Sequence, residues 1–256
     1  MTAESGLSCK RPDFLIGGAP RCGTTWLYRV LDLHPSIWMA KPLRPEPKFF
    51  LVDDEYRRGL TYYRERWFSG VPSAVVAGEK STNYLESALA AERIAHDLPR
   101  AKVIFLLREP AARALSNYQW TRMHGLEDLD FFDAVMQETD REAAYAGHDR
   151  YSRPFSYFSR GLYAQLLRPW FKELPSDQVL VLRFEDIIDD RAKLLSGVHR
   201  FLGVEERTEL GEELGVVNEA PSVAVDPDVM SALHDRYTEP NDRLYRLIGR
   251  RLWSTP

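Results

Sequence analysis

The residues most able to do chemistry begin in a glycine-rich run near the N-terminus. The sequence Phe14-Leu-Ile-Gly-Gly-Ala-Pro-Arg-Cys-Gly-Thr-Thr-Trp passes from an apolar stretch into glycines, a cation and two hydroxyls. Glycine allows backbone angles that turn consecutive N–H groups toward one anion, and a following helix adds its unpaired N–H groups and positive dipole end. Arg21, Gly23, Thr24 and Thr25 are therefore predicted to bind a phosphate-like group.

The spacing of this run separates it from the loop that binds nucleoside triphosphates, G-x-x-x-x-G-K-[ST]. Gly18 and Gly23 keep the distance between the glycines, but Thr24 stands where that loop has lysine, and the cation lies earlier. A triphosphate site also needs an acidic residue after a second strand to hold Mg²⁺. Here the apolar run 103–107 ends at Arg108, which suits a further phosphate and does not hold a metal.

Arg108 has a partner for anion binding eight residues further along the chain. A helix is predicted from Pro110 to residue 122, because proline is favoured at the first helical position. Ser116 lies two turns into that helix, so its hydroxyl and the Arg108 guanidinium can converge on one phosphate. The chain therefore has two predicted anion positions, one after each of two buried strands.

A proline-rich segment holds the candidate general base. Its sequence is Met39-Ala-Lys-Pro-Leu-Arg-Pro-Glu-Pro-Lys-Phe-Phe, in which three prolines within six residues keep the backbone extended. Such a segment can hold Glu46, with Arg44 and Lys48, in set directions near the glycine-rich loop. Nearby cations lower the pKa of a carboxyl and burial raises it, so the sequence leaves the pKa of Glu46 open. The alternative is a surface loop whose phenylalanines fill the core while Glu46 is solvated.

Several of these motifs resemble one enzyme family. The run from Ala19 to Trp26 resembles the 5′-phosphosulfate loop of sulfotransferases that use 3′-phosphoadenosine 5′-phosphosulfate (PAPS), and Arg108 with Ser116 resembles the 3′-phosphate site of that family. The segment Pro-Glu-Pro-Lys-Phe-Phe resembles the Glu-x-x-Phe-Phe segment of the heparan-sulfate branch, whose glutamate is taken as the base. Carried over, that base is Glu46.

Two further segments extend the resemblance. Glu79-Lys-Ser-Thr-Asn-Tyr is similar to Glu-Lys-Ser-Ala-Asn-Tyr of the same branch, which implies that Lys80 stabilises charge at the sulfuryl group; the alternative is a solvated cation at a helix entry. Arg160 and Tyr163 match an Arg-Gly-x-Tyr pattern that lies near the nucleotide in the family. The resemblance therefore implies catalytic roles for Glu46, Lys80, Arg21 and Lys48, and cofactor contacts from Arg21, Cys22, Gly23, Thr24, Thr25, Trp26, Arg108, Ser116, Arg160 and Tyr163.

The resemblance also implies a reaction. A sulfuryl group moves in line from PAPS to a hydroxyl, less readily an amine, of a small-molecule or saccharide acceptor, with Glu46 as base and without a metal. Residues 215–222 depart from the heparan-sulfate branch, because they contain no basic residue where that branch has a Gly/Lys/Arg-rich loop over the cofactor. This departure counts against a polyanionic glycan. The polar, irregular stretch 124–155 resembles an insertion that covers the acceptor.

Two other functions stay open on the residues alone. A small-molecule kinase that uses ATP has the same broad fold, although the missing lysine after Gly23 and the arginine at position 108 count against it. A non-catalytic nucleotide-binding protein would keep the loop without the chemistry. That function would be favoured if Glu46 and Lys80 pointed away from the phosphosulfate position.

The elements that must position these residues alternate between strand and helix. This alternation predicts an α/β fold, a parallel sheet with helices on both faces and the ligand at the carboxyl ends of the strands, and the resemblance narrows it to the P-loop-type sulfotransferase fold. Trp26 lies at a helical core position, which favours packing over a ligand contact. A flexible lead at 1–12 is expected before a single domain at 13–256. Strands are predicted at 13–18, 75–78, 102–108 and 179–186, and helices at 24–33, 56–70, 81–98, 110–122, 156–171, 191–202 and 228–253, the last broken at Pro240.

Composition sets limits on location and partners. The chain has 256 residues, a formal net charge of −4 and two cysteines. This charge gives no general attraction to nucleic acid or anionic lipid, and two cysteines make no disulfide framework. The first residues lack the apolar core of a signal peptide, and no stretch reaches the ~20 apolar residues of a membrane span, so a cytoplasmic protein is expected. Six histidines without ligand spacing argue against a metal site.

Overall fold

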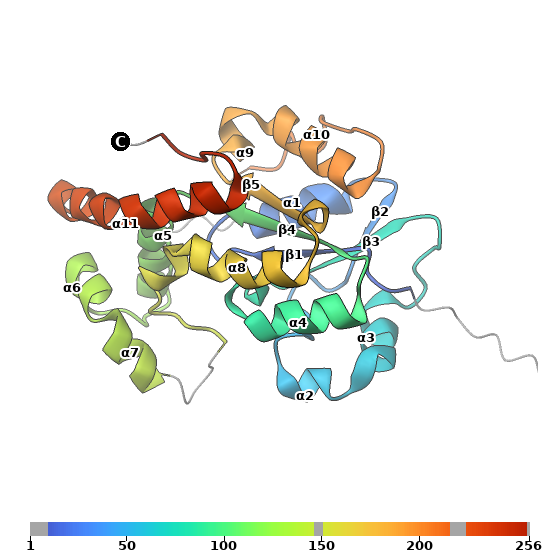
Figure 1. Cartoon of the computed structure of the whole chain (residues 1–256), viewed down its shortest axis with the longest axis horizontal. Coiled ribbons are helices and arrows are strands. Elements are labelled where there is room, and N and C mark those ends of the chain that lie inside the picture. The colour runs from blue at the N-terminus through green and yellow to red at the C-terminus, as the bar shows by residue number, and fades with distance from the viewer. Residues whose placement is uncertain (1–9, 146–150, 216–223, 255–256) are drawn as a thin grey trace, which may run out of the picture.

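A parallel sheet of five strands forms the centre of the molecule, in the order β2-β3-β1-β4-β5 (Figure 1). The computed structural model describes residues 10–145, 151–215 and 224–254, so most of the predicted N-terminal lead and of the stretch 215–222 lies outside the described residues. The sheet confirms the predicted α/β fold. Its strands are β1 Phe14–Gly18, β2 Ile37–Met39, β3 Val76–Lys80, β4 Lys102–Leu107 and β5 Val179–Arg183.

The middle strand, β1, is buried along its whole length. It pairs with β3 on one side and β4 on the other, so that Phe14 lies opposite both Gly78 and Lys102. A Cβ at position 78 would lie 2.2 Å from the ring of Phe14, so glycine is required there. The chain first extends the sheet from β1 toward β2 and then crosses to β4 and β5, which makes the carboxyl end of β1 a topological switch point.

Helices cover both faces of this sheet (Figure 1). On one face lie α1 Thr24–Asp32 and α10 Arg191–Leu202, and on the other α4 Ala88–Asp97 packs against α8 Tyr163–Glu173. Trp170 of α8 meets Phe105 of β4 with ring centroids 4.9 Å apart. The remaining helical elements are α2 Asp53–Tyr56, α3 Gly59–Phe68, η1 Tyr84–Glu86, α5 Pro110–Met123, α6 Phe131–Met136, α7 Glu138–Tyr145, η2 Ser159–Gly161, η3 Ser176–Gln178, α9 Asp186–Asp189 and α11 Pro227–Ile248.

The structure corrects several predicted boundaries. The predicted helix 81–98 is a short 3₁₀ turn followed by α4, because the Ser87 side chain accepts a hydrogen bond from the Ala90 N–H and so caps a new helix start. The predicted helix 156–171 likewise begins only at Tyr163, after the turn η2. Pro240 does not break α11, whose buried stripe continues on both sides of it.

The stretch 124–155 is irregular only in part, since it contains α6 and α7, while residues 124–130 and 151–155 form turns and irregular structure. Asp130 caps α6 by accepting a hydrogen bond from the Asp133 N–H at 2.9 Å. Phe131 of α6 then packs against Tyr118 of α5 in a second apolar cluster beside the main core. An apolar face and a side-chain cap thus form helices in a segment whose composition is polar.

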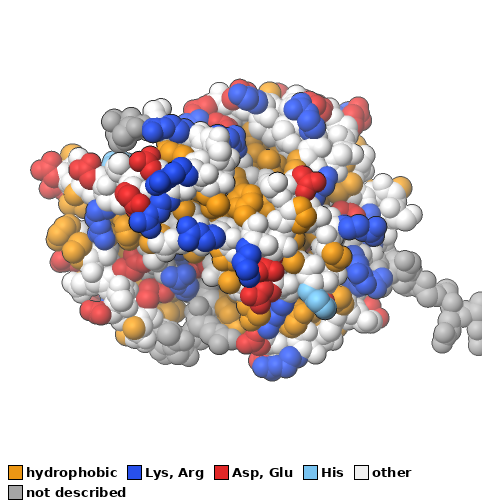
Figure 2. All heavy atoms as spheres, viewed as in Figure 1, with side chains coloured by type: hydrophobic (Ala, Val, Ile, Leu, Met, Phe, Trp, Pro, Cys, Tyr) orange, Lys and Arg blue, Asp and Glu red, His pale blue; other side chains and the backbone are white. Residues whose placement is uncertain are grey.

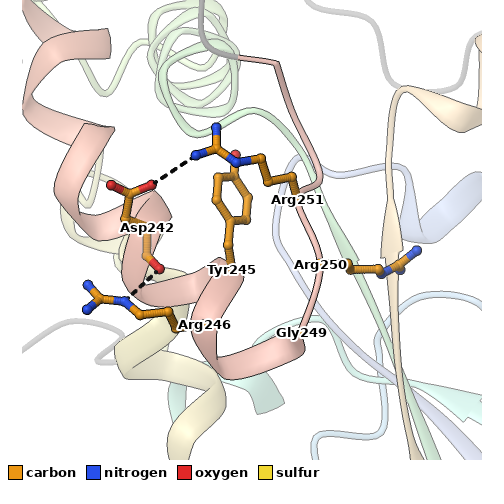
Figure 3. A pocket seen from close by; sticks show the side chains of 6 residues that line it. All are labelled: Asp242, Tyr245, Arg246, Gly249, Arg250 and Arg251. Atoms are coloured by element: carbon orange, nitrogen blue, oxygen red, sulfur yellow. Dashed lines mark hydrogen bonds and ion pairs between the residues drawn. The ribbon is translucent and has the colours of Figure 1, made fainter.

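The C-terminal end of α11 lines a shallow hollow of about 660 Å³ that contains three arginines (Figure 3). Arg246 donates to the Asp242 carbonyl, and Arg251 lies 3.8 Å from the Asp242 carboxylate. Arg250 donates to the carbonyl of Val181 in β5. The Arg250 contact joins the chain after α11 to β5, and the Arg251 contact joins it to α11.

The surface carries charges of both signs. On the face shown in Figure 2, basic and acidic side chains are interspersed around an apolar area, which agrees with the small net charge of −4. Within the described residues, no helix combines the length and the apolar character that a membrane crossing requires.

A pair of buried histidines joins α1 to α10. The rings of His34 and His199 lie 5.0 Å apart. His199 accepts a hydrogen bond from the Arg207 N–H at Nδ1, and its Nε2 has no hydrogen-bond partner among the described residues. Burial, and then the neighbouring His34, lower the pKa of His199, so the folded protein keeps this ring neutral.

We expect the free energy of unfolding to fall as the pH drops below about 6.5, the ordinary pKa of histidine. The unfolded chain takes up a proton at His199 in that range, whereas the folded protein does so only at its lower pKa, and one such proton contributes at most about 1.4 kcal/mol per pH unit. Urea unfolding of wild type and His199→Asn from pH 5 to 8 measures this contribution. The variant should show the smaller pH slope, and equal slopes would contradict the assignment.

Candidate active site

The carboxyl ends of β3, β1 and β4 lie side by side and bring the predicted cations together. Ile16 of β1 pairs with Lys80, the last residue of β3, and the loop after β1 follows directly. Arg21 in this loop donates from Nε to the Ser116 hydroxyl at 3.3 Å. The two predicted anion positions are therefore adjacent, because Ser116 belongs to the helix that begins after Arg108.

The loop after β1 leads into α1 through a left-handed glycine. Gly23 has φ +78, and a Cβ there would lie 2.7 Å from Ile187 and 2.9 Å from Phe184, so no other residue fits. Thr24 and Thr25 form the first turn and are 5% and 9% exposed. The N–H groups of this turn have no partner within the helix, so they and the helix dipole act on whatever anion lies at this end.

Two arginines dominate the electrostatics of this edge. Burial, and then the charge of Arg108, lower the pKa of Arg21 to about 10, and Arg113 and Arg44 act in the same direction. Arg21 is still a cation at neutral pH. In the described part of the chain, Arg108 contacts the Phe184 ring at 4.8 Å and pairs with no carboxylate. An anion between Arg21 and Arg108 would relieve their repulsion, so the two arginines suit the phosphate site that the sequence predicts.

Tyr163 and Cys22 support these arginines from the interior. The Tyr163 hydroxyl donates to the Arg108 carbonyl at 2.9 Å and lies 3.8 Å from the Cys22 sulfur. Burial raises the pKa of the Cys22 thiol, so the thiol is protonated at neutral pH. The two side chains therefore join the loop after β1 to the end of β4, and the contacts of either one with a cofactor stay predictions.

Glu46 lies at the end of β3 in contact with Lys80. Its Oε1 accepts hydrogen bonds from the Lys80 ammonium and, at 2.6 Å, from the Thr82 hydroxyl, and its Oε2 accepts the Thr82 N–H at 3.0 Å. Burial alone would raise the pKa of Glu46, but the charge of Lys80 and these hydrogen bonds outweigh it and hold that pKa below its usual value. Glu46 is therefore an oriented, largely buried carboxylate and not a solvated one, although Phe49 and Phe50 do fill the core as the surface-loop alternative expected.

A chain of hydroxyls links Glu46 to the phosphate loop. The Thr82 hydroxyl that donates to Glu46 lies 3.5 Å from the Thr24 hydroxyl at the start of α1. Lys48 follows Glu46 by two residues, and its backbone N–H donates to the Ser81 hydroxyl at 2.8 Å. The proline-rich segment thus lies on the end of β3 and adjoins the loop after β1.

Two of the predicted cofactor residues have other contacts. Arg160 is 4% exposed and pairs with Glu86 at 2.8 Å, and it donates to the Ser152 carbonyl. Trp26 is 5% exposed and belongs to the main apolar core. The packing that sequence reasoning favours for Trp26 is what the structure contains, and contacts of either side chain with a cofactor stay predictions.

Sequence reasoning misses two residues of this site. Thr82 makes two hydrogen bonds to Glu46, and its only signal is its place beside Lys80 in the Glu-Lys-Ser-Thr segment. Arg113 is fully buried behind the loop, where it donates to the carbonyls of Ser156 and Tyr157. A buried cation five residues after Arg108 has no signal in the sequence, since arginine is normally exposed.

No group of three or more histidine, cysteine, aspartate or glutamate side chains suited to a metal ion occurs within the described ranges. The donors at the strand ends are ammonium, guanidinium, hydroxyl and backbone N–H groups, which bind anions rather than metal ions.

Comparison with known proteins agrees with this geometry. The sulfotransferase domain model matches residues 11–214. Human bifunctional heparan sulfate N-deacetylase/N-sulfotransferase 1 is 34% identical over 207 residues, which cover 77% of this chain and 23% of that protein. The human type 3 enzyme is 35% identical over the same length and coverage. The chain thus spans about a quarter of the length of the curated relatives it matches.

Solved structures give the same result. A sulfotransferase from Alicyclobacillus acidocaldarius superposes with a TM-score of 0.79 at 28% identity, covering 95% of this chain and 98% of the other. The sulfotransferase domain from the curacin biosynthetic pathway, at 16% identity and a TM-score of 0.53, shares the fold. Because the domain model covers most of the chain and two curated relatives are 34% and 35% identical, this chain belongs to the sulfotransferase family.

Proposed function

We propose that this protein moves a sulfuryl group from PAPS to a hydroxyl of a small-molecule or saccharide acceptor. The observation that carries the proposal is the position of Glu46, which contacts Lys80 and reaches the phosphate loop through Thr82 and Thr24. A base for the acceptor thus lies next to the anion site. This arrangement supports catalysis over mere nucleotide binding, because Glu46 and Lys80 face each other and the loop.

The residues at the strand ends fit both ends of PAPS. Arg21, the first-turn N–H groups of α1 and the Thr24 and Thr25 hydroxyls would hold the 5′-phosphosulfate. Arg108 and Ser116 would hold the 3′-phosphate. Because ATP has no 3′-phosphate, these contacts would select PAPS over ATP. The hydrogen bond between Arg21 and Ser116 supports two adjacent anion positions. The bound cofactor supplies the sulfuryl group, whose bond to the 5′-phosphate oxygen breaks as the acceptor oxygen bonds to sulfur.

Glu46 acts as general base in this proposal. Its Oε2 accepts one hydrogen bond from the protein, so a second lone pair is open to the acceptor hydroxyl. Lys80 holds the carboxylate oriented, and Lys80 with Lys48 can neutralise charge on the sulfuryl oxygens. Because burial by itself raises the Glu46 pKa, any movement of Lys80 toward those oxygens makes Glu46 a stronger base as the proton is removed.

The acceptor can also be an amine. The curated relatives carry an N-sulfotransferase in their names, and Glu46 could deprotonate either nucleophile. Incubation of the enzyme with radiolabelled PAPS and 2-naphthol, N-acetylglucosamine or glucosamine separates the cases. Labelled naphthol or labelled N-acetylglucosamine would support transfer to a hydroxyl. If glucosamine alone is labelled, and at its nitrogen, the proposed acceptor group would have to be changed from a hydroxyl to an amine.

The buried free thiol of Cys22 in the loop after β1 is in keeping with the proposal of a cytoplasmic, reducing location.

Calorimetric titration with adenosine 3′,5′-bisphosphate (PAP), the desulfated product, tests the cofactor assignment against the kinase alternative. We expect PAP to bind at least about tenfold more tightly than ATP with Mg²⁺, since hydrogen bonds to the 3′-phosphate are charge-assisted and worth about 1.5–3 kcal/mol. Tighter binding of ATP with Mg²⁺ would favour the kinase, and binding of neither nucleotide would overturn the proposal.

Glu46→Gln should lower kcat by about 10²–10⁴-fold while PAP affinity changes little, because the variant keeps the side-chain shape and loses the base. Release of PAP from PAPS, followed with an acceptor of the panel, measures kcat, and calorimetry measures the affinity. The matched control is Glu65→Gln at an exposed glutamate of α3, which should behave as wild type. Normal turnover by Glu46→Gln would remove Glu46 from the role of base.

Arg108→Ala should weaken PAP binding by about 10- to 100-fold and leave the affinity for adenosine 5′-monophosphate nearly unchanged. The reason is that only PAP carries the 3′-phosphate assigned to Arg108. Calorimetry with both nucleotides on wild type, Arg108→Ala and the exposed control Arg29→Ala measures the difference. An equal loss of affinity for both nucleotides would show that Arg108 does not bind the 3′-phosphate.

A further inference from the structure

A buried carboxylate next to Lys80 is used by none of these steps. Glu79 in β3 is fully buried, and its side chain points to the opposite side of the strand from that of Lys80. Three hydroxyls donate to it, from Tyr63 at 3.2 Å, Tyr84 at 2.8 Å and Ser81 at 2.7 Å. No cation pairs with Glu79 within the described residues. Burial of a carboxylate without a paired cation costs free energy, so the presence of Glu79 at this position requires an explanation.

Two of the three hydroxyls connect Glu79 to the segment that carries the base. Ser81 donates to Glu79 and accepts the Lys48 N–H at 2.8 Å. Tyr84 donates to Glu79 and accepts the Phe50 N–H at 3.3 Å. A hydroxyl that donates a hydrogen bond to a carboxylate becomes a better hydrogen-bond acceptor. The charge on Glu79 therefore strengthens both backbone contacts.

The segment needs this support because its backbone is strained. Lys48 has φ +46, in the left-handed region that a lysine rarely adopts. Its N–H donates to Ser81, and its carbonyl accepts the N–H groups of Leu51 and Val52, so the Ser81 bond is one of the contacts that fix this conformation. Lys48 also has no acidic partner among the described residues, so its ammonium is available to an anion.

We propose that Glu79 is a positioning residue, which acts through the hydroxyls of Ser81 and Tyr84 to hold the segment 46–50, and with it Glu46 and Lys48, on the end of β3. This inference rests on the proposed function for its catalytic consequence. Its structural part, the hold of Glu79 on the segment, stands independently of the reaction.

The surroundings of Glu79 make this hold sensitive to pH. Burial raises the pKa of Glu79 to about 7, against the hydrogen bonds from Ser81, Tyr84 and Tyr63, and the charge of Glu46 adds a small increase. The pKa values of Tyr63 and Tyr84 are raised well above 10, so neither hydroxyl ionises in the same range. A protonated Glu79 donates a hydrogen bond to one of these hydroxyl oxygens, and at Ser81 or Tyr84 it then competes with the backbone N–H of Lys48 or Phe50.

Hydrogen exchange of the Lys48 and Phe50 amides tests the hold directly. Glu79→Gln and Ser81→Ala should lower the protection of the Lys48 amide by about 5- to 10-fold, the effect of one neutral hydrogen bond. Tyr63→Phe is the matched control, because Tyr63 donates to the same carboxylate but makes no hydrogen bond with either amide in the described structure, and protection should stay within about twofold. Corrected for intrinsic exchange, wild-type protection should fall as the pH drops through about 7, and Glu79→Gln should lack this change.

Release of PAP from PAPS, with water as acceptor, tests the catalytic consequence. At pH 8, Glu79→Gln should lower kcat by about 10- to 100-fold, and it should lose the component of the wild-type kcat profile with a pKa near 7. Its PAP affinity should stay within about twofold of wild type, since the phosphate loop is untouched. Thermal unfolding of each variant checks that it is folded at the assay temperature.

The outcomes separate the two proposals. Unchanged protection of the Lys48 amide in both Glu79→Gln and Ser81→Ala overturns the positioning role, whatever the wild type catalyses. A lower melting temperature with unchanged kcat and pH profile also overturns it, because Glu79 would then only stabilise the core. Absence of PAP binding by the wild type refutes the proposed function, while the exchange experiment still decides whether Glu79 holds the segment.

Discussion

The ion pair between Glu46 and Lys80 is the contact on which the arrangement of the site depends. The Lys80 side chain is 3% exposed and that of Glu46 is 15% exposed, so both charges are largely removed from water. Removal of one partner of such a buried pair costs about 3–5 kcal/mol, because the other charge is left uncompensated. The pair therefore fastens an extended, proline-rich loop to a central strand, and it fixes the protonation state of the carboxylate that the loop carries.

The parallel sheet determines which side chains can join this pair. Its strands all end at the same edge, so residues far apart in the chain meet there: Lys80 at the end of β3, the glycine-rich loop after β1 and Arg108 after β4. Alternation along β3 then gives its two neighbouring ionisable residues different surroundings. Lys80 lies at the open edge with Glu46, while Glu79 is enclosed by hydroxyls and supports the same loop from inside.

Sequence reasoning could predict the features that depend on local chain properties. The strands β1, β3, β4 and β5, the glycine turn at position 23 and the cations at the strand ends follow from apolar runs, glycine spacing and residue type, whereas the short strand β2 was not predicted. Features set by tertiary contacts were beyond it. Pro240 stays inside α11 because the buried stripe of that helix extends across it, and α6 forms in a polar stretch because Phe131 finds a second apolar cluster. The roles of Thr82 and Arg113 depend on contacts with residues 36 and 43 positions away, respectively, which no local pattern encodes.

The distribution of charge explains why the site suits a ligand with two anionic ends. The whole chain has a net charge of −4, and the face in Figure 2 mixes both signs, yet the edge of the sheet gathers Arg21, Arg108 and the buried Arg113. These cations repel one another strongly enough to lower the pKa of Arg21 beyond the effect of burial. A single phosphate at the loop would offset only the part of that repulsion nearest to it. In the proposed assignment, a second phosphate at Arg108 and Ser116 would offset the rest. One molecule that fills both positions would then gain affinity, because the loss of motional freedom is incurred once.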